Sequence, residues 1–117
     1  MSTPPLSSYR RAGDLVFLSG EVPRDADGKI PENFGDQVDL VLRKITATLA
    51  SIELTLADVV SVTVYVSDPK HFADLNTVYR RHFKEPFPSR TTVTAALMLP
   101  ADVEITVVAA ERKAAKA

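Results

Sequence analysis

The sequence of 117 residues contains no cysteine and no tryptophan, and it has two histidines and four dispersed glycines. Without cysteine there are no disulfide bonds, no thiolate zinc sites and no cysteine nucleophile. His71 and His82 offer too few ring nitrogens for a multi-histidine metal centre, and the glycines form no phosphate-binding loop. An enzyme built from this chain would therefore work through arginine, tyrosine, asparagine, hydroxyl, carboxylate or backbone groups, and we expect no metal.

The chain also lacks a large net excess of positive or negative charge, and it lacks long apolar runs. Fourteen lysines and arginines stand against 15 aspartates and glutamates, which gives a net charge of -1. Such a chain lacks the broad positive field that drives nucleic-acid binding. No apolar run approaches the roughly 18 residues that a membrane span needs, and the first residues show no signal-peptide core. We expect a cytoplasmic protein that binds neither nucleic acid nor membrane.

The length corresponds to one domain, and no internal repeat divides it. Residues 1–7, with two prolines, are expected to form a flexible lead-in. Residues 8–112 carry all the periodic segments and are expected to form the domain. Residues 113–117 are expected to form a soluble tail.

Alternating and β-branched segments predict strands, and apolar residues at helical spacing predict two helices. Asn33 is the expected N-cap of the first helix, and Asp68 with Pro69 begins the second. Both histidines fall off the apolar stripe of the second helix, which predicts that they are exposed. The expected strands are residues 9–12, 14–20, 58–68, 90–99 and 103–111, the expected helices are residues 34–52 and 69–83, and the buried stripe of the second helix is Phe72, Leu75, Tyr79 and Phe83.

The element order ββαβαββ predicts an α+β fold in which both helices cover one face of a mixed sheet. The other face then carries Thr63, Tyr65, Thr106 and Val108, a mixed and partly apolar surface. Sheets with such a face commonly bury it against another copy of the same chain. The sequence therefore predicts a homo-oligomer with sites where its copies meet.

Arg90 is the strongest single candidate for a binding residue. It follows a proline-rich segment, residues 86–89, and opens a predicted strand. An arginine at the mouth of a strand can hold a carboxylate through two parallel, charge-assisted hydrogen bonds. A surface arginine or a structural ion pair is the commoner outcome for such a residue. Tyr9, Asn76 and Gly20 are weaker candidates, because each has an ordinary structural role as well.

Taken together, five segments of the chain resemble the RidA family, also called YjgF, of enamine and imine deaminases. They are SGEVP (19–23), VVSVTVYVSD (59–68), FADLNTVYRRHF (72–83), PFPSRTTV (86–93) and LPADVEITVVA (99–109). The resemblance implies a chorismate-mutase-like fold, a homotrimer with clefts between subunits, and no cofactor. It also implies hydrolysis of reactive 2-aminoacrylate-type enamines and imines to a 2-keto acid and ammonia.

The resemblance also assigns roles to residues. It puts the arginine that holds the substrate carboxylate on Arg90, assisted by the backbone of Thr92. It puts substrate-contacting tyrosine and asparagine on Tyr9 and Asn76. The glycine of the first motif falls on Gly20, preceded by Ser19.

Two departures from the family pattern affect the chemistry. The water-orienting glutamate of the last strand is replaced by Thr106, whose hydroxyl can hold a water but is a very poor base. Glu104 lies roughly 7 Å along the same strand face and is a possible stand-in. The segment from Arg90 to Pro100 is one residue longer than the pattern. Away from the chemistry, Glu53 stands at a helix end where the family often has glycine.

Three functions remain open at this point. The first is a trimeric deaminase in which Arg90 and Thr106 are the catalytic residues. The second is a trimeric small-carboxylate binder or sensor that keeps Arg90 but has lost water activation. The third, a ribonuclease, is disfavoured by the net charge and by the lack of aromatic residues among the basic ones.

Overall fold

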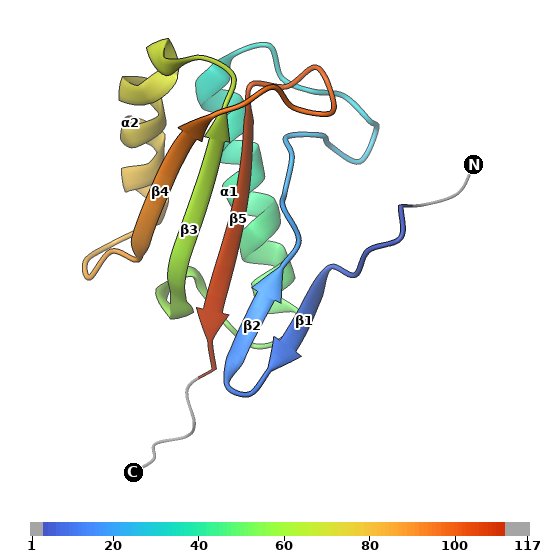
Figure 1. Ribbon diagram of the computed structural model, residues 1–117, viewed down its shortest axis with the longest axis vertical. Helices are drawn as coiled ribbons and strands as arrows, with labels where there is room; N and C mark the ends of the chain where they lie inside the picture. Colours follow the sequence, from blue (N-terminus) through green and yellow to red (C-terminus); the bar gives the residue numbers. More distant parts are fainter. Residues whose placement is uncertain (1–3, 112–117) are drawn as a thin grey trace.

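The computed structural model describes residues 4–111, so the expected tail at 113–117 lies outside the described residues. Seven main elements follow one another in the predicted order (Figure 1), and two short 3-10 helices, Leu56–Asp58 and Pro69–His71, precede β3 and α2. The elements are β1 (Tyr9–Ala12), β2 (Leu15–Leu18), α1 (Phe34–Ala50), β3 (Val59–Val66), α2 (Phe72–His82), β4 (Ser89–Thr94) and β5 (Val103–Ala110).

The five strands form one mixed sheet in the order β1-β2-β5-β3-β4. β3 and β4 are parallel, whereas the other neighbouring pairs are antiparallel. Both helices pack on the same side of the sheet, with α1 behind its centre and α2 behind the β4 edge (Figure 1). The predicted α+β fold with two helices on one face is therefore confirmed. In the part of the chain described here, no helix is both long and apolar enough to cross a membrane.

The core lies between the sheet and the two helices. Alternate residues of β3 and β5 turn toward the helices and are buried, and the apolar stripe of α1 covers them. The buried stripe of α1 also includes Leu42 and Gln37, which the sequence pattern did not single out. Gln37 is satisfied by donating to the Pro31 carbonyl at 2.8 Å and accepting from the Asp102 amide at 2.8 Å.

The ends of α1 follow from particular residues. The Asn33 side chain accepts a hydrogen bond from the Asp36 amide at 3.0 Å, as predicted for an N-cap. Beyond the helix, Glu53 adopts a left-handed conformation with φ 64°. A residue with a Cβ atom is strained there, whereas glycine is not. The helix-end position where glycine was expected therefore has the backbone geometry that favours glycine.

Both histidines help to hold α2, so the prediction that they are exposed is wrong. The His71 ring stacks on Phe34 with centroids 4.1 Å apart. The His82 side chain is 16% exposed, and its Nε2 lies 2.8 Å from Oδ1 of Asp39 on α1. Arg43 and His82 together lower the pKa of the Asp39 carboxyl through hydrogen bonds. The error arises because the apolar stripe of α2 alone does not show that His71 and His82 pack against residues of α1.

Three other local predictions are corrected by the structure. β4 ends at Thr94 instead of continuing to residue 99. A β-bulge between Val59 and Ser61 turns Val60 outward, so Val59 takes the core position expected of Val60. Phe72 was expected in the buried stripe of α2, but it is 51% exposed.

The sheet face away from the helices is open in this single chain. Its residues alternate with the buried ones along each strand, as predicted for β3 and β5. Leu15, Phe17 and Val93 are exposed, while Thr63 and Tyr65 are half-buried. The face is thus apolar enough to pack against another surface.

Candidate active site

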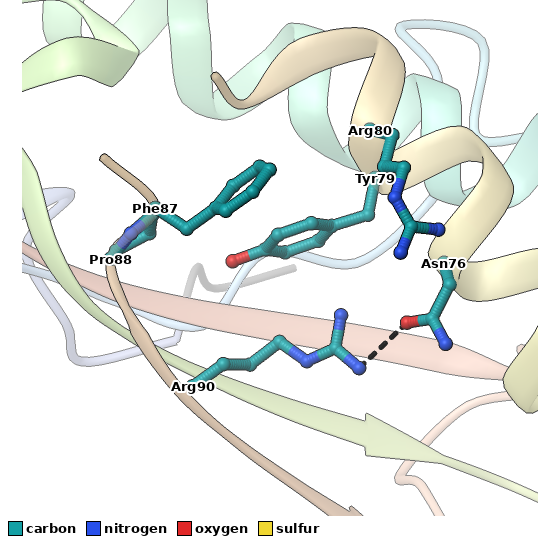
Figure 2. A pocket seen from close by; sticks show the side chains of 6 residues that line it. All are labelled: Asn76, Tyr79, Arg80, Phe87, Pro88 and Arg90. Atoms are coloured by element: carbon teal, nitrogen blue, oxygen red, sulfur yellow. Dashed lines mark hydrogen bonds between the residues drawn. The ribbon is translucent and has the colours of Figure 1, made fainter. Parts of the chain in front are cut away.

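A pocket of about 270 Å³ opens between α2 and the start of β4. Figure 2 shows side chains descending from α2 toward Arg90, which rises from β4, with the turn before β4 on the opposite side. The lining contains two guanidinium groups and no carboxylate, which makes the pocket attractive to anions. The lining residues are Asn76, Tyr79, Arg80, Phe87, Pro88 and Arg90.

Arg90 points to the helix side of the sheet because it occupies the register position opposite Val62, a core residue of β3. At the edge of the sheet this position faces α2 rather than the centre of the core. One guanidinium N–H donates to Oδ1 of Asn76 at 2.7 Å. The guanidinium carbon lies 4.8 Å from the Tyr79 ring centroid. The Phe72 ring centroid lies 5.7 Å from the same carbon, so one hydrogen bond and two aromatic rings fix the group and leave further N–H donors for a ligand.

Tyr79 contributes a second polar group to the pocket. Its side chain is 5% exposed, and its hydroxyl is the one buried side-chain oxygen or nitrogen of residues 4–111 that has no hydrogen-bond partner. Burial raises the pKa of this hydroxyl, and the charge of Arg90 offsets part of that rise. The group is therefore a neutral donor at ordinary pH. An unpaired buried hydroxyl is costly, so it favours a site that a ligand completes.

A second cluster of predicted site residues lies on the open face of the sheet. A Cβ atom at Gly20 would collide with Oε2 of Glu104 and would come within 3.1 Å of Oγ1 of Thr106. Close approach favours glycine here, since its φ is not in the left-handed region and a larger side chain would have to displace Glu104. Glu104 and Thr106 therefore stand together over Gly20, and we call these three residues the Gly20 cluster.

Glu21, which follows Gly20, does not belong to this cluster. Its carboxylate lies 3.0 Å from the ammonium of Lys44 on α1. The Lys44 ammonium also donates to the carbonyls of Val22 and Arg24. Through its ion pair with Lys44, Glu21 thus holds the segment after β2 against α1.

The structure brings some of the predicted site residues together and separates others. Arg90, Asn76 and Thr92 lie on the helix side at the β4 edge. Tyr9 is on β1, at the opposite edge of the sheet. The Ser19 hydroxyl donates to the Ser7 carbonyl at 2.6 Å. Within one chain, therefore, only part of the predicted set lines the pocket.

The distance between Arg90 and the Gly20 cluster follows from the strand order. Glu104 and Thr106 are on β5, and only β3 lies between β5 and β4, so strand spacing separates these two residues from β4 by about 10 Å. The two groups also lie on opposite faces of the sheet. No single small ligand can touch both within one copy.

Sequence reasoning missed four residues that line the pocket: Tyr79, Arg80, Phe87 and Pro88. A usable signal was present for the first two, because they follow Asn76 by three and four residues and so share its face of a helix. Tyr79 was assigned to the buried stripe, which is correct but incomplete. No group of three or more possible metal ligands occurs in residues 4–111.

The family model described as Endoribonuclease L-PSP matches residues 1–111 of this chain. The chain belongs to that family, RidA/YjgF. Protein HMF1 of Saccharomyces cerevisiae is 36% identical over 108 residues, which cover 91% of this chain and 84% of that protein. TdcF of Escherichia coli, named for a reactive intermediate deaminase activity, is 35% identical over 97 residues, covering 80% of this chain and 74% of TdcF.

Solved structures of the RidA/YjgF family share the fold. RidA from the Antarctic bacterium Psychrobacter gives a TM-score of 0.88 at 29% identity, covering 94% of this chain and 91% of that one. A crystal structure of Escherichia coli TdcF with bound serine also gives 0.88, at 30% identity and with coverage of 95% and 91%. These matches confirm the family that the sequence motifs indicated.

Proposed function

We propose that this protein hydrolyses reactive enamine and imine acids of the 2-aminoacrylate type to 2-keto acids and ammonia. The observation that carries the proposal is the Arg90 guanidinium, held by Asn76 and Tyr79 in an open pocket without a carboxylate. A fixed guanidinium binds a carboxylate with two parallel hydrogen bonds. The family membership and the name of TdcF support the same reaction class.

The chemistry asks little of the protein beyond positioning. An enamine acid tautomerises to its imine, whose carbon is electrophilic. Water adds to that carbon, and the resulting aminoalcohol expels ammonia to leave the 2-keto acid. Arg90 holds the carboxylate next to the reacting carbon, and its charge stabilises the negative charge of the bound acid throughout. Neither a metal nor a cofactor is required in this scheme.

The water is held, in our proposal, by the Gly20 cluster of a neighbouring copy. Thr106 can bind a water through its hydroxyl, and Glu104 stands beside it over Gly20. Because this cluster cannot reach the Arg90 pocket within one chain, the complete site requires a second copy. A homotrimer that buries the open sheet face would supply it at each cleft, together with Tyr9 and Ser19 as further substrate contacts.

A second candidate function is a binder or sensor of small carboxylates without deaminase activity. The observation that favours it is Thr106, because a threonine hydroxyl is a very poor base. A pocket that holds a carboxylate through Arg90 suits a binder as well as it suits a deaminase. Cleavage of RNA is not proposed, despite the description of the family model, because the chain has a net charge of -1. The cytoplasmic location stays a prediction.

The deciding experiment follows the loss of 2-iminopropionate generated in situ by a serine dehydratase. We expect the protein to accelerate the loss, and Arg90→Ala to reduce the acceleration about 10²–10³-fold. Arg81→Ala, an exposed arginine of α2 that does not line the pocket, is the matched control and should keep full activity. No acceleration, with pyruvate still bound in a titration, would support the binder. Full activity in Arg90→Ala would contradict the role assigned to Arg90, although the protein would still be a deaminase.

A further inference from the structure

The pocket contains a second guanidinium that the proposed reaction does not use. Arg80 lines the pocket together with Arg90, although it comes from α2 rather than β4. No ion pair or side-chain hydrogen bond of the Arg80 guanidinium occurs among residues 4–111; its backbone carbonyl alone accepts from Lys84. Figure 2 shows its side chain descending on the same side of α2 as Asn76, toward the Arg90 group.

Asn76 adjoins both arginines, Arg90 through a hydrogen bond and Arg80 through helical spacing. Asn76 and Arg80 are one helical turn apart and share a face of α2. The Asn76 carbonyl oxygen already accepts from Arg90, so its NH₂ group is left to donate elsewhere. A ligand held by Arg90 thus has a second guanidinium and an amide donor within the same pocket.

Two like charges in one pocket repel each other unless an anion lies between them. The other lining residues, Tyr79, Phe87 and Pro88, bring no negative charge to offset the two guanidinium groups. A ligand with a single carboxylate neutralises one cation and leaves the other facing an aromatic wall. A short ligand with two carboxylates neutralises both.

From this arrangement we infer that the pocket selects dianionic substrates, with Arg80 holding a second carboxylate. The preferred substrates among the proposed imine acids are then 2-imino dicarboxylic acids, as formed by oxidation of an acidic amino acid. Water adds to its imine carbon and ammonia leaves, which gives a 2-oxo dicarboxylate. The inference rests on the proposed role of Arg90, since Arg80 orients only a ligand that Arg90 already holds.

The test compares the binding of succinate and succinamate by calorimetric titration at low ionic strength. The two probes have nearly the same shape, but succinamate has an amide in place of one carboxylate. We expect succinate to bind about tenfold more tightly, the size of a partly exposed charge-assisted pair. Added salt should reduce that preference, because the Arg80 group is exposed and screened.

Two variants test whether Arg80 causes the preference for succinate over succinamate. Arg80→Gln should reduce it from about tenfold to about twofold while succinamate affinity stays unchanged. Arg81→Gln removes the same charge from the next residue, which lines a different pocket between the helices, and should keep the preference.

The outcomes separate this inference from the function on which it rests. Equal binding of the two probes would overturn the inference but leave the Arg90 site intact. A preference that persists in Arg80→Gln would also overturn it, because the second carboxylate would then be held elsewhere. No binding of either probe would overturn the carboxylate site itself, and the proposed function with it.

Discussion

The Arg90 pocket and the Gly20 cluster show two ways in which this fold presents polar groups. Arg90 is held by the hydrogen bond that it donates to Asn76 and by the rings of Tyr79 and Phe72, and all three partners come from α2 in the same chain. Glu104 and Thr106 stand on the open face of the sheet, and their neighbour is a glycine without a side chain. The first group is fixed by a packed helix, whereas the second borders a surface that the single chain leaves uncovered.

This difference indicates that the two groups have different functions, one binding the carboxylate and the other positioning water. A guanidinium that must hold a carboxylate benefits from being fixed before the ligand arrives, and packing against α2 provides that. A group that positions water needs an uncrowded approach, and the missing side chain at Gly20 leaves space for the Glu104 carboxylate beside Thr106. Four substitutions test whether the two groups have these different functions, from the largest expected effect to the smallest.

Among the substitutions that follow, that of Gly20 by valine should have the largest effect. The new side chain would displace Glu104 and fill the space beside Thr106, so we expect kcat/KM for 2-iminopropionate to fall about 10²-fold. Gly20→Ala should cost less, because the first atom it meets is the mobile end of Glu104. Unchanged activity in Gly20→Val would exclude the Gly20 cluster from the site.

Substitution of Asn76 by alanine tests the fixed half of the site. Arg90 would lose the acceptor that orients it, and we expect kcat/KM to fall about 30-fold with little change in melting temperature. Thr77→Ala, which alters the next and exposed residue of α2, is the control. Equal losses from the two variants would mean that α2 is merely perturbed.

Substitution of Thr106 by glutamate should raise activity. A carboxylate at this position would orient and deprotonate water better than a hydroxyl, and we expect kcat to rise about tenfold. Thr63→Glu is a matched control, because Thr63 lies directly opposite Thr106 on β3 and on the same sheet face. The absence of any gain at position 106 would contradict the role assigned to the Gly20 cluster.

Substitution of Tyr79 by phenylalanine should have two small effects of opposite sign. Removal of the unpaired buried hydroxyl should stabilise the fold by about 1 kcal/mol in thermal unfolding. If the hydroxyl bonds to the ligand, binding of small carboxylates should weaken about threefold. A change in stability alone would mean that Tyr79 only packs against Arg90.

The sequence was enough to predict the order of the elements and the helix-covered face, because these depend on periodicity along the chain. Asn33 as an N-cap was equally local, whereas the neighbours that make glycine favourable at position 20 come from β5. The environment of His82 could not be predicted in this way, since its partner Asp39 comes from another helix. The end of β4 at Thr94 was missed because residues 95–99 are apolar enough to continue a strand.

The candidate site was predicted unevenly for the same reason. Arg90 and Asn76 were candidates from their position in the sequence, and the family resemblance added their roles. Their contact could be seen only once α2 was packed beside β4. Arg80 was not among the sequence candidates, because helical spacing alone does not show which face of α2 borders a pocket. Tyr9 stays a prediction, since it lies at the far edge of the sheet from Arg90.

The central claim is that one active site combines the Arg90 pocket of one copy with the Gly20 cluster of the next. It is tested most directly by unfolding Arg90→Ala and Gly20→Val together in equal amounts, refolding the mixture and measuring 2-iminopropionate hydrolysis. Random assembly of a cyclic oligomer pairs an intact Arg90 with an intact Gly20 in about one cleft of four. The account therefore predicts that about a quarter of wild-type activity returns, although neither variant is active alone. If activity stays at the level of the separate variants, both groups belong to sites within a single chain and the account is contradicted.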